Sequence, residues 1–331
     1  MKIFITAMNT PRMNTFFPEH LMEKLRSFGE VSRNPHARKM TREELAEELK
    51  DTDILITHWG APQVDAEMLA NAPRLKMLAH AAGTVAHIAS EAFYEKGIPV
   101  LSANPLMART VAEGALAYIL AGQRLFVQKD RSMREKKWEN FLSDRISLLD
   151  GAVGFIGCGA VARHLMDLLR PFGCKVYVYD PYLPEEALAP WDFARKVSFE
   201  EAMRQPVVSV HAAQMPETYH MINAEALALM PDRGLLVNTS RGSLVDTQAL
   251  IQELQTGRIH AVLDVYEKEG AGNQPDELLA CLDNCILQPH IAGISGPYLT
   301  EGIVADIERF LRGEPLQLTV SLQQYRLMTQ E

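Results

Sequence analysis

The 331-residue sequence is poor in cysteine, has no long uninterrupted apolar run and has no excess of basic residues. Four cysteines in a chain of this length do not make a disulfide framework. No window approaches the roughly 18 consecutive apolar residues of a membrane-spanning helix. The apolar start, Met1–Thr6, is too short for a secretory signal and predicts a buried first strand instead. We therefore expect a cytoplasmic protein without a membrane partner.

The net charge of −9 narrows the class of partner further. A negative chain offers no electrostatic footprint for nucleic acid, and an anionic membrane surface repels it. A small anionic substrate would need a local cationic group rather than a field of the whole protein. No His or Cys lies at zinc-finger spacing from Cys281 and Cys285, so we expect no metal site and interpret both as packing residues.

Strand and helix patterns alternate along the whole chain. This alternation predicts mostly parallel α/β sheets with helices on both faces, and the length predicts about two domains. Strands are expected at 2–7, 53–57, 75–79, 99–102, 152–156, 175–179, 207–211, 234–238, 259–264 and 285–288. Helices are expected at 19–28, 41–50, 65–71, 110–125, 160–169 and 299–312. Thr41 and Glu44 predict a capping box at the start of the second helix.

The expected helix at 110–125 is mostly apolar. Such a helix must bury both faces, so we expect it at the interface of a homodimer. Residues 138–150 carry no regular pattern and predict a loop or an arm.

A glycine-rich turn joins the expected strand at 152–156 to the expected helix at 160–169. Gly157 permits a tight turn, Gly159 lets the backbone approach a pyrophosphate, and the helix N-terminus at Ala160 and Val161 offers free N–H groups. Ala162 replaces the third glycine, as the dinucleotide-binding fingerprint allows. Taken alone, the pattern is as typical of a plain sharp turn.

Asp180 ends the next expected strand, about 20 residues after the glycine turn. A carboxylate at this spacing binds the ribose hydroxyls of the adenosine and repels a 2′-phosphate, which favours NAD over NADP. The alternative is that Asp180 and Pro181 only begin a turn. The combination of loop, strand and spacing favours the cofactor role.

Three later residues supply the groups that a dehydrogenase of 2-hydroxy acids needs. Arg241 follows an apolar strand, and a guanidinium binds a carboxylate bidentately. His290 also follows an apolar strand, and an imidazole donates or accepts a proton near neutral pH. Glu269 is the candidate carboxylate that favours the imidazolium and holds its tautomer. A surface ion pair and a structural histidine are the alternatives for Arg241 and His290.

Several stretches of this sequence are typical of one enzyme family. They are 111–113, 153–162, 180–181, 207–211, 215–218, 221–223, 238–242 (Asn-Thr-Ser-Arg-Gly), 244–246, 263–266 and 289–293 (Pro-His-Ile-Ala-Gly). On these residues the chain resembles the D-isomer-specific 2-hydroxyacid dehydrogenases. The resemblance implies a Rossmann-type doubly wound parallel-sheet domain for NAD at 103–292. It also implies a smaller flavodoxin-like α/β substrate domain made of 1–102 and 293–331.

The resemblance also implies roles for single residues. Arg241 would anchor the substrate, His290 would be the acid/base, Glu269 its partner, and Asp264 would hold the nicotinamide amide. The residues implied in cofactor binding are Gly157, Gly159, Ala160, Val161, Asp180, His211, Thr239, Ser240, Arg241, Asp264, His290 and Gly293. The residues implied in substrate binding, besides Arg241, are Ala82 and Gly83, in the loop after the strand at 75–79, and Trp59.

The chain departs from the family in several places. The loop 80–87 lacks an aspartate usual in its second half and carries His80 and His87. We expect His87 to bond nearby backbone and leave His80 open between that role and the pocket. The loop 57–60 lacks the arginines with which related phosphoglycerate dehydrogenases bind phosphate, and we expect no regulatory domain after residue 331. A neutral or apolar substrate tail against Trp59 is favoured, unless Trp59 is a core residue. Cys158 is interpreted as a small filler of the pyrophosphate loop.

The sequence therefore predicts an NAD-dependent oxidoreductase that moves a hydride between nicotinamide and C2 of a D-2-hydroxy acid or 2-keto acid. Glyoxylate, hydroxypyruvate and related short acids are the default candidates. The acid, the direction and residual use of NADP stay open. An NAD(H)-sensing, corepressor-like interaction protein is the alternative, because that class uses the same fold. A family relative acting on formate or phosphite is a third possibility. Glu269 argues against a formate enzyme, because the resemblance implies Gln as the histidine partner there.

Overall fold

The computed structural model describes residues 1–138, 147–269, 275–293 and 296–328. Two compact units divide the chain: unit 1 is Met1–Met107 with Ser295–Glu331, and unit 2 is Ala108–Ile294. The expected domain boundaries, at 102–103 and 292–293, lie close to these divisions in the sequence. The expected loop or arm at 138–150 falls mostly outside the described residues.

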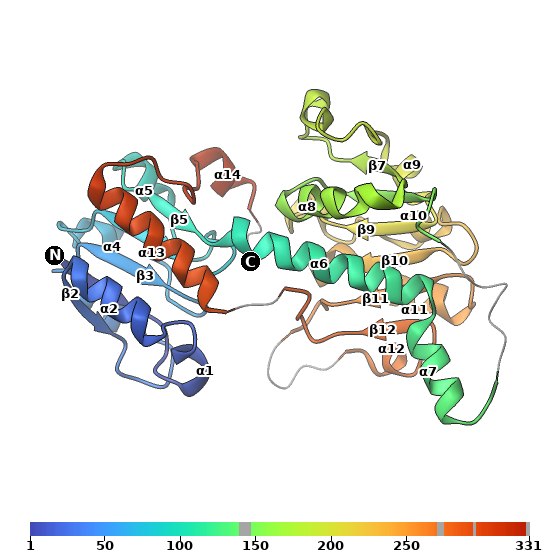
Figure 1. The fold of residues 1–331 in the computed structure, drawn as a ribbon, viewed down its shortest axis with the longest axis horizontal. Helices are drawn as coiled ribbons and strands as arrows, with labels where there is room; N and C mark the ends of the chain where they lie inside the picture. The colour runs from blue at the N-terminus through green and yellow to red at the C-terminus, as the bar shows by residue number, and fades with distance from the viewer. Residues whose placement is uncertain (139–146, 270–274, 294–295, 329–331) are drawn as a thin grey trace. The chain divides into compact units, whose positions relative to one another are not determined.

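Unit 1 contains a five-stranded parallel sheet in the order β2-β1-β3-β4-β5 (Figure 1). Its strands are β1 (Lys2–Ile5), β2 (Glu30–Arg33), β3 (Ile54–Thr57), β4 (Met77–His80) and β5 (Val100–Ser102). Its helices are α1 (Pro11–Asn14), α2 (Glu19–Phe28), α3 (Arg42–Leu49), α4 (Ala66–Ala70), α5 (Glu91–Glu95), α13 (Pro297–Arg312) and α14 (Leu322–Arg326). Alternate strand residues point to opposite faces. Ile3 and Ile5 thus join the core under α2 and α13, whereas Phe4 joins the core under α3 to α5.

Unit 2 contains a seven-stranded parallel sheet in the order β12-β11-β10-β9-β6-β7-β8. Its strands are β6 (Ala152–Ile156), β7 (Lys175–Tyr179), β8 (Ala194–Lys196), β9 (Val207–Val210), β10 (Leu235–Asn238), β11 (His260–Leu263) and β12 (Cys285–Leu287). The helices are α6 (Asn104–Gln123), α7 (Phe126–Arg134), α8 (Ala160–Leu169), α9 (Phe199–Met203), α10 (Ala224–Ala228), α11 (Thr247–Gln255) and α12 (Glu277–Ala280). Two separate apolar cores cover the two faces of the sheet.

The predicted fold class is confirmed by these two sheets. Unit 2 has the strand order of a Rossmann-type sheet, and unit 1 has the order 2-1-3-4-5 of a flavodoxin-like sheet. Two details of the prediction were wrong. The helix expected at 110–125 begins at Asn104, and Cys281, interpreted as a packing residue, is exposed. The edge strands β2 and β8 were not predicted, since the polar segments Glu30–Arg33 and Ala194–Lys196 lack an apolar pattern.

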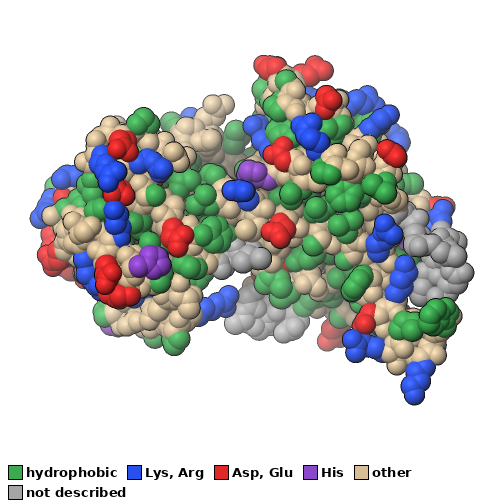
Figure 2. Space-filling view, viewed as in Figure 1, with side chains coloured by type: hydrophobic (Ala, Val, Ile, Leu, Met, Phe, Trp, Pro, Cys, Tyr) green, Lys and Arg blue, Asp and Glu red, His purple; other side chains and the backbone are tan. Residues whose placement is uncertain are grey.

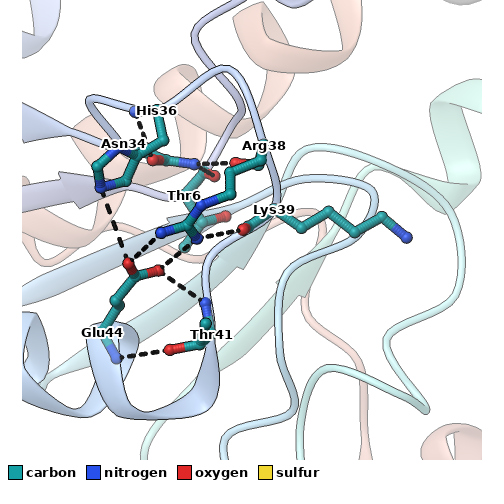
Figure 3. Close-up of polar contacts among 7 residues, drawn as sticks. All are labelled: Thr6, Asn34, His36, Arg38, Lys39, Thr41 and Glu44. Atoms are coloured by element: carbon teal, nitrogen blue, oxygen red, sulfur yellow. Dashed lines mark hydrogen bonds and ion pairs between the residues drawn. The ribbon is translucent and has the colours of Figure 1, made fainter.

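The predicted capping box of α3 is present. The Thr41 side chain accepts from the Glu44 backbone N–H, and the Glu44 carboxylate accepts from the Thr41 backbone N–H. Figure 3 shows that the same carboxylate also binds the guanidinium of Arg38, at 2.8 and 2.5 Å. Asn34 donates to the Arg38 carbonyl oxygen at 2.9 Å, so the turn between β2 and α3 is held from both ends.

Each sheet has one point at which the strand order reverses. In unit 1 this point lies between β1 and β3, and in unit 2 between β6 and β9. Open α/β sheets bind ligands outside the carboxyl ends of their strands at such topological switch points. The fold therefore offers one candidate position for a small molecule in each unit.

Acidic and basic side chains are interspersed over the visible face of each unit in Figure 2. Within the described residues, none of the helices combines the length and the apolar character needed to cross a bilayer.

Candidate active site

The predicted site residues of unit 2 gather along one edge of its sheet. Gly157, His211 and Asp264 come directly after β6, β9 and β11. Because all seven strands are parallel, their carboxyl ends form one edge. At the switch point, Gly157 has φ +96°, and a Cβ there would lie 2.5 Å from the Ala212 nitrogen. Glycine is thus required for the β6 turn to approach the segment after β9.

The turn after β6 leads into helix α8, whose N-terminus is suited to binding an anion. Gly159 is the N-cap of α8, and no side chain caps this helix. A Cβ placed on Gly159 would meet no heavy atom within 4 Å, so space adjoins the loop. The first N–H groups of the helix, at Ala160 and Val161, therefore face a position open to a pyrophosphate.

Asp180 follows β7 and connects the glycine loop to the next turn. One carboxylate oxygen accepts from the Cys158 backbone N–H and the other from the Tyr182 backbone N–H, both at 2.9 Å. The bond from Tyr182 is the turn-initiating arrangement that the sequence offered as the alternative role of Asp180. The bond from Cys158 holds Asp180 beside the glycine loop, so Asp180 can begin the turn and also bind the cofactor. Cys158 itself is buried, and burial raises the pKa of its thiol to about 11, which keeps it protonated.

Two buried polar groups near the switch point lack partners among the described residues. They are the Nε2 atom of His211 and the hydroxyl of Thr239. Burial lowers the pKa of His211 to about 3, so its imidazole is neutral. Buried polar atoms are normally hydrogen-bonded. These two fit the polar edge of a dinucleotide, and together with the uncapped helix they show that the residues present suit such a cofactor.

The loop after β10 is organised by Asn238. Its side-chain oxygen accepts from the Ser240 N–H at 3.0 Å, and its amide donates to the Arg241 carbonyl oxygen at 2.9 Å. The Ser240 hydroxyl donates to the Ala212 carbonyl oxygen at 2.5 Å, which ties this loop to the one after β9. The Arg241 guanidinium, half-buried, donates to the Ser240 carbonyl oxygen at 2.8 Å.

Close backbone packing joins the Arg241 loop to the loop that carries Glu269. A Cβ on Gly242 would lie 1.9 Å from the Tyr266 carbonyl carbon, so only glycine permits this approach. The Tyr266 N–H donates to Glu269 Oε1 at 2.9 Å, and its hydroxyl donates to the Gln288 carbonyl oxygen at 2.9 Å. Tyr266 therefore connects the Arg241, Glu269 and His290 segments.

Glu269 and His290 form a hydrogen-bonded pair. Glu269 Oε2 lies 2.6 Å from His290 Nδ1. The hydrogen bond to Glu269 raises the pKa of His290, against the opposing effects of burial and of the Arg241 charge. Burial favours the neutral form of Glu269, but the hydrogen bonds from His290 and Tyr266 prevail and lower the pKa of that carboxyl. Arg241 acts electrostatically on both groups, so the structure brings the three predicted residues together.

The backbone of His290 is held in an uncommon conformation. Its φ is +56°, in the left-handed region that non-glycine residues seldom adopt. The Asp264 carboxylate, 1% exposed, accepts from the backbone N–H groups of Ile291 and Ala292, both at 2.9 Å. The Tyr118 hydroxyl of α6 donates to the same carboxylate at 3.1 Å. Asp264 thus positions the loop that carries His290, and Gly293 follows in the same loop.

Unit 1 contains the predicted substrate residues Ala82, Gly83 and Trp59. Ala82 and Gly83 follow β4 and are buried, and within the described part of the chain their backbone N–H groups donate no hydrogen bond. Trp59 is 39% exposed, so the core alternative is excluded. The expectation that His87 bonds nearby backbone is not supported, since its Nδ1 has no partner among the described residues.

His80 is buried and contacts a side chain rather than backbone, while its Nε2 has no partner among the described residues. Its Nδ1 lies 2.9 Å from the Thr57 hydroxyl on the neighbouring strand, and its side chain is 1% exposed.

Residues that reasoning from sequence missed are the positioning ones. Asn238 and Tyr266 hold Arg241 and Glu269 through hydrogen bonds that span only three residues of the chain. Tyr118 instead binds Asp264 from a helix far away in the sequence. Asn238 lies within the Asn-Thr-Ser-Arg-Gly stretch that was typical of the family, so its position in the sequence could have identified it. Tyr118 sits in an apolar helix and gives no sequence signal of its partner.

Comparison with known proteins gives a consistent picture. Residues 116–292 match the family described as D-isomer specific 2-hydroxyacid dehydrogenase, NAD binding domain. The chain is 33% identical to a D-3-phosphoglycerate dehydrogenase of Methanocaldococcus jannaschii, over 92% of this chain and 58% of that protein. It is 31% identical to a glyoxylate reductase of Thermococcus litoralis, over 95% of this chain and 94% of the reductase. The chain thus spans less than two thirds of the first relative and nearly all of the second.

A similar solved structure is that of D-lactate dehydrogenase with NAD+ from Lactobacillus jensenii. Its TM-score is 0.78 at 20% identity, covering 97% of this chain and 100% of the other. At this identity the similarity demonstrates a shared fold.

The pair of Glu269 and His290 leads to a prediction that does not depend on the reaction. Glu269→Gln should return the pKa of His290 toward the ordinary histidine value, because a neutral amide does not stabilise the imidazolium. A pH titration of the histidine ring protons by NMR measures this change. The ring signals of the exposed His20 in α2, far along the chain from the substitution, serve as the internal control. An unaltered His290 pKa would show that the two side chains do not interact in solution.

Proposed function

Because the chain belongs to the D-isomer-specific 2-hydroxyacid dehydrogenase family, we propose that it interconverts a 2-keto acid and a D-2-hydroxy acid with NAD. The observation that carries the proposal is the Glu269–His290 hydrogen bond of 2.6 Å, within the electrostatic reach of Arg241. A cation for a carboxylate and an imidazole with a raised pKa are what this reaction needs.

The matched domain is an NAD-binding domain, and its glycine loop supplies the pyrophosphate position. When bound, the nicotinamide donates a hydride to C2 of the acid or accepts one from it. The residues proposed to hold the cofactor are Gly157, Gly159, Ala160, Val161, Asp180, His211, Thr239, Ser240, Arg241, Asp264, His290 and Gly293. His211 and Thr239 are supported by their unpartnered polar atoms, and Gly159 by the adjoining space.

We assign the proton transfer to and from the C2 oxygen to His290. Its Nδ1 is bonded to Glu269, so the other ring nitrogen, Nε2, is the one that serves the C2 oxygen. In reduction Nε2 gives its proton to the developing alkoxide, and in oxidation it takes the proton of the hydroxyl. The raised pKa keeps more of the imidazole protonated near neutral pH, which supports the reducing direction. Reduction should therefore slow as the pH rises through this pKa.

Arg241 is assigned to the substrate carboxylate. The guanidinium lies at the edge where ligands bind and supplies the local cation that a chain of net charge −9 needs. Ala82 and Gly83, in unit 1, stay our proposal for substrate binding, supported by backbone N–H groups that donate no hydrogen bond within the described residues. Trp59 stays our proposal for a contact with the substrate tail, supported by its exposure.

The test of this function is NADH oxidation with a panel of 2-keto acids, including glyoxylate, hydroxypyruvate, pyruvate and 2-ketoisocaproate. Wild-type protein should turn over at least one of them. His290→Ala should lower that turnover by at least about a hundredfold, because the proton donor is lost, while NADH binding persists. Tight NADH binding with no turnover of any acid would instead favour the NAD(H)-sensing interaction protein.

Cofactor choice gives a separate prediction. Asp180→Ala should narrow the preference for NADH over NADPH, because the carboxylate that repels a 2′-phosphate is removed. Steady-state kinetics with both cofactors, at a fixed concentration of the best acid, measure the ratio of kcat/KM values. A wild type that already prefers NADPH would contradict the assignment of Asp180.

We also propose a homodimer in the cytoplasm. The four cysteines are free thiols, which suits a reducing compartment. The sequence placed the interface at residues 110–125, and several exposed apolar side chains lie on α7, the next helix along the chain. Phe126, Val127 and Met133 are 69%, 41% and 52% exposed. Side chains of this size exposed together are typical of an interface.

The dimer is tested by sedimentation of a charged variant. Phe126→Asp should shift the protein toward a monomer, because a carboxylate cannot be buried in an apolar contact. Tyr219→Asp, at an aromatic residue 60% exposed elsewhere in unit 2, is the matched control and should leave the mass unchanged. A monomeric wild type would exclude the interface.

A further inference from the structure

A cavity of about 310 Å³ lies in unit 2 between the start of α11, the segment after β11 and the start of α12. Its volume is at the lower end of small-molecule sites, which measure roughly 300 to 1,000 Å³. The residues that line it differ from those proposed to bind the cofactor or the acid. The cavity is therefore a second candidate site within unit 2.

Part of the lining is apolar. Val245, Leu250, Val265 and Leu279 line the cavity, and all four side chains are buried. Removing an apolar group from water into such aliphatic surroundings is favourable. The cavity thus offers affinity to a ligand with an apolar part.

The polar part of the lining carries an excess of negative charge. Asp246, Glu267 and Asp276 contribute three carboxylates. Against them, Lys268 contributes one ammonium group, and this residue is exposed. A cavity lined by charge of one sign concentrates ions of the opposite sign, so a cation is favoured.

The carboxylates already satisfy the helix that begins at the cavity. Asp246 Oδ1 accepts from the backbone N–H groups of Gln248 and Ala249, both at 3.0 Å. Glu267 Oε1 accepts from the Thr247 hydroxyl at 2.6 Å and from the Thr247 N–H at 3.3 Å. An anion would therefore find the first N–H groups of α11 occupied. Within the described residues Asp246 Oδ2 and Glu267 Oε2 accept no hydrogen bond, so both are open to a donor.

A buried nitrogen lies beside the same carboxylate. His220 Nε2, in the lining, is 3.3 Å from Glu267 Oε1 but makes no hydrogen bond with any described residue. Buried polar atoms are normally hydrogen-bonded. An ammonium group has three donors, enough for the two open carboxylate oxygens and this ring nitrogen.

A metal ion does not fit this arrangement. Among the described residues, no three His, Cys, Asp or Glu side chains converge closely enough to hold one. A hydrated ion would also gain nothing from the aliphatic part of the lining. An organic cation uses both parts of the cavity.

We propose that this cavity binds a small organic cation, a primary ammonium ion on a short apolar group. The ammonium donates to Asp246 Oδ2, Glu267 Oε2 and His220 Nε2, and the apolar group packs against the aliphatic side chains. The binding itself does not depend on the proposed function.

The cavity shares a wall with the candidate active site. Gly242 and Tyr266 line it, and the Tyr266 backbone N–H donates to Glu269. A cation bound here lies beside the backbone that holds the partner of His290. The site is thus placed to regulate the Glu269–His290 pair.

The probe is 2-phenylethylammonium, titrated into the whole wild-type protein by calorimetry. Two matched compounds keep the phenylethyl group and change the polar end: 2-phenylethanol is neutral and 3-phenylpropionate is an anion. The ammonium ion should bind saturably, and the alcohol at least about tenfold more weakly, because hydrogen bonds to charged groups are the stronger ones. The anion should not bind. Equal affinity for ammonium ion and alcohol, or no saturable binding of the ammonium ion, would overturn the proposal.

Variants place the ammonium ion in the cavity. Asp246→Asn together with Glu267→Gln removes two charges but keeps the helix cap and an acceptor for Thr247. This double variant should weaken binding of the ammonium ion by at least about fivefold and leave 2-phenylethanol unchanged. Glu225→Gln, at an exposed carboxylate of α10, is the matched control and should bind as wild type. Unchanged affinity in the folded double variant would overturn the site, and the three compounds decide on wild type if it does not fold.

Regulation is tested on the ring protons of His290. Their NMR signals should move as 2-phenylethylammonium is added, with the dissociation constant found by calorimetry, while those of the exposed His20 should stay in place. Stationary His290 signals despite binding would overturn the regulatory role. Neither measurement uses turnover, so a failure here leaves the proposed dehydrogenase standing, and a failure to reduce any 2-keto acid leaves the cation site standing.

Discussion

The buried carboxylate of Asp264 is the interaction on which the candidate active site depends. Asp264 lies at the end of β11, and its carboxylate accepts hydrogen bonds from two backbone N–H groups of the segment after β12 and from the Tyr118 hydroxyl of α6. A buried carboxylate without donors would be strongly destabilising, so this arrangement persists only with all three segments in place. It in turn supports the left-handed backbone of His290, which directs the imidazole toward Glu269. Backbone strain of this kind is found where the surrounding contacts over-determine it.

The protonation of the site depends on the charged groups that these contacts bring together. The hydrogen bond to Glu269 raises the pKa of His290, while burial and the Arg241 charge oppose this effect without cancelling it. The same guanidinium lowers the pKa of Glu269 and helps to keep it ionised. The close approach of Gly242 and Tyr266 places these opposing influences beside each other. The buried histidines of unit 1 differ from His290, since burial lowers the pKa of His58 to about 4 and that of His80 to about 3, which keeps both imidazoles neutral.

Much of the fold was predictable because its determinants are local. The strands β6 and β7 and the helices α2 and α8 have the bounds that hydrophobic periodicity predicted, and Thr41 caps α3 as its spacing indicated. The edge strands β2 and β8 were missed, since a strand paired on one side needs no apolar pattern. The start of α6 was also missed, although the Ser102 hydroxyl accepts from the Asn104 backbone N–H at 3.0 Å where the helix begins.

Residue type and local spacing were enough to predict the alternation of strands and helices, the glycine turn and Arg241, Glu269 and His290 as candidate groups for a hydride-transfer site. Three features became visible only in the folded chain: which nitrogen of His290 is bonded, that Asp264 supports the His290 loop, and that His58 Nε2 is buried without a partner among the described residues. Hydrogen bonds between segments far apart in the chain, and the exclusion of water around them, arise only when the chain has folded, so no local pattern encodes them.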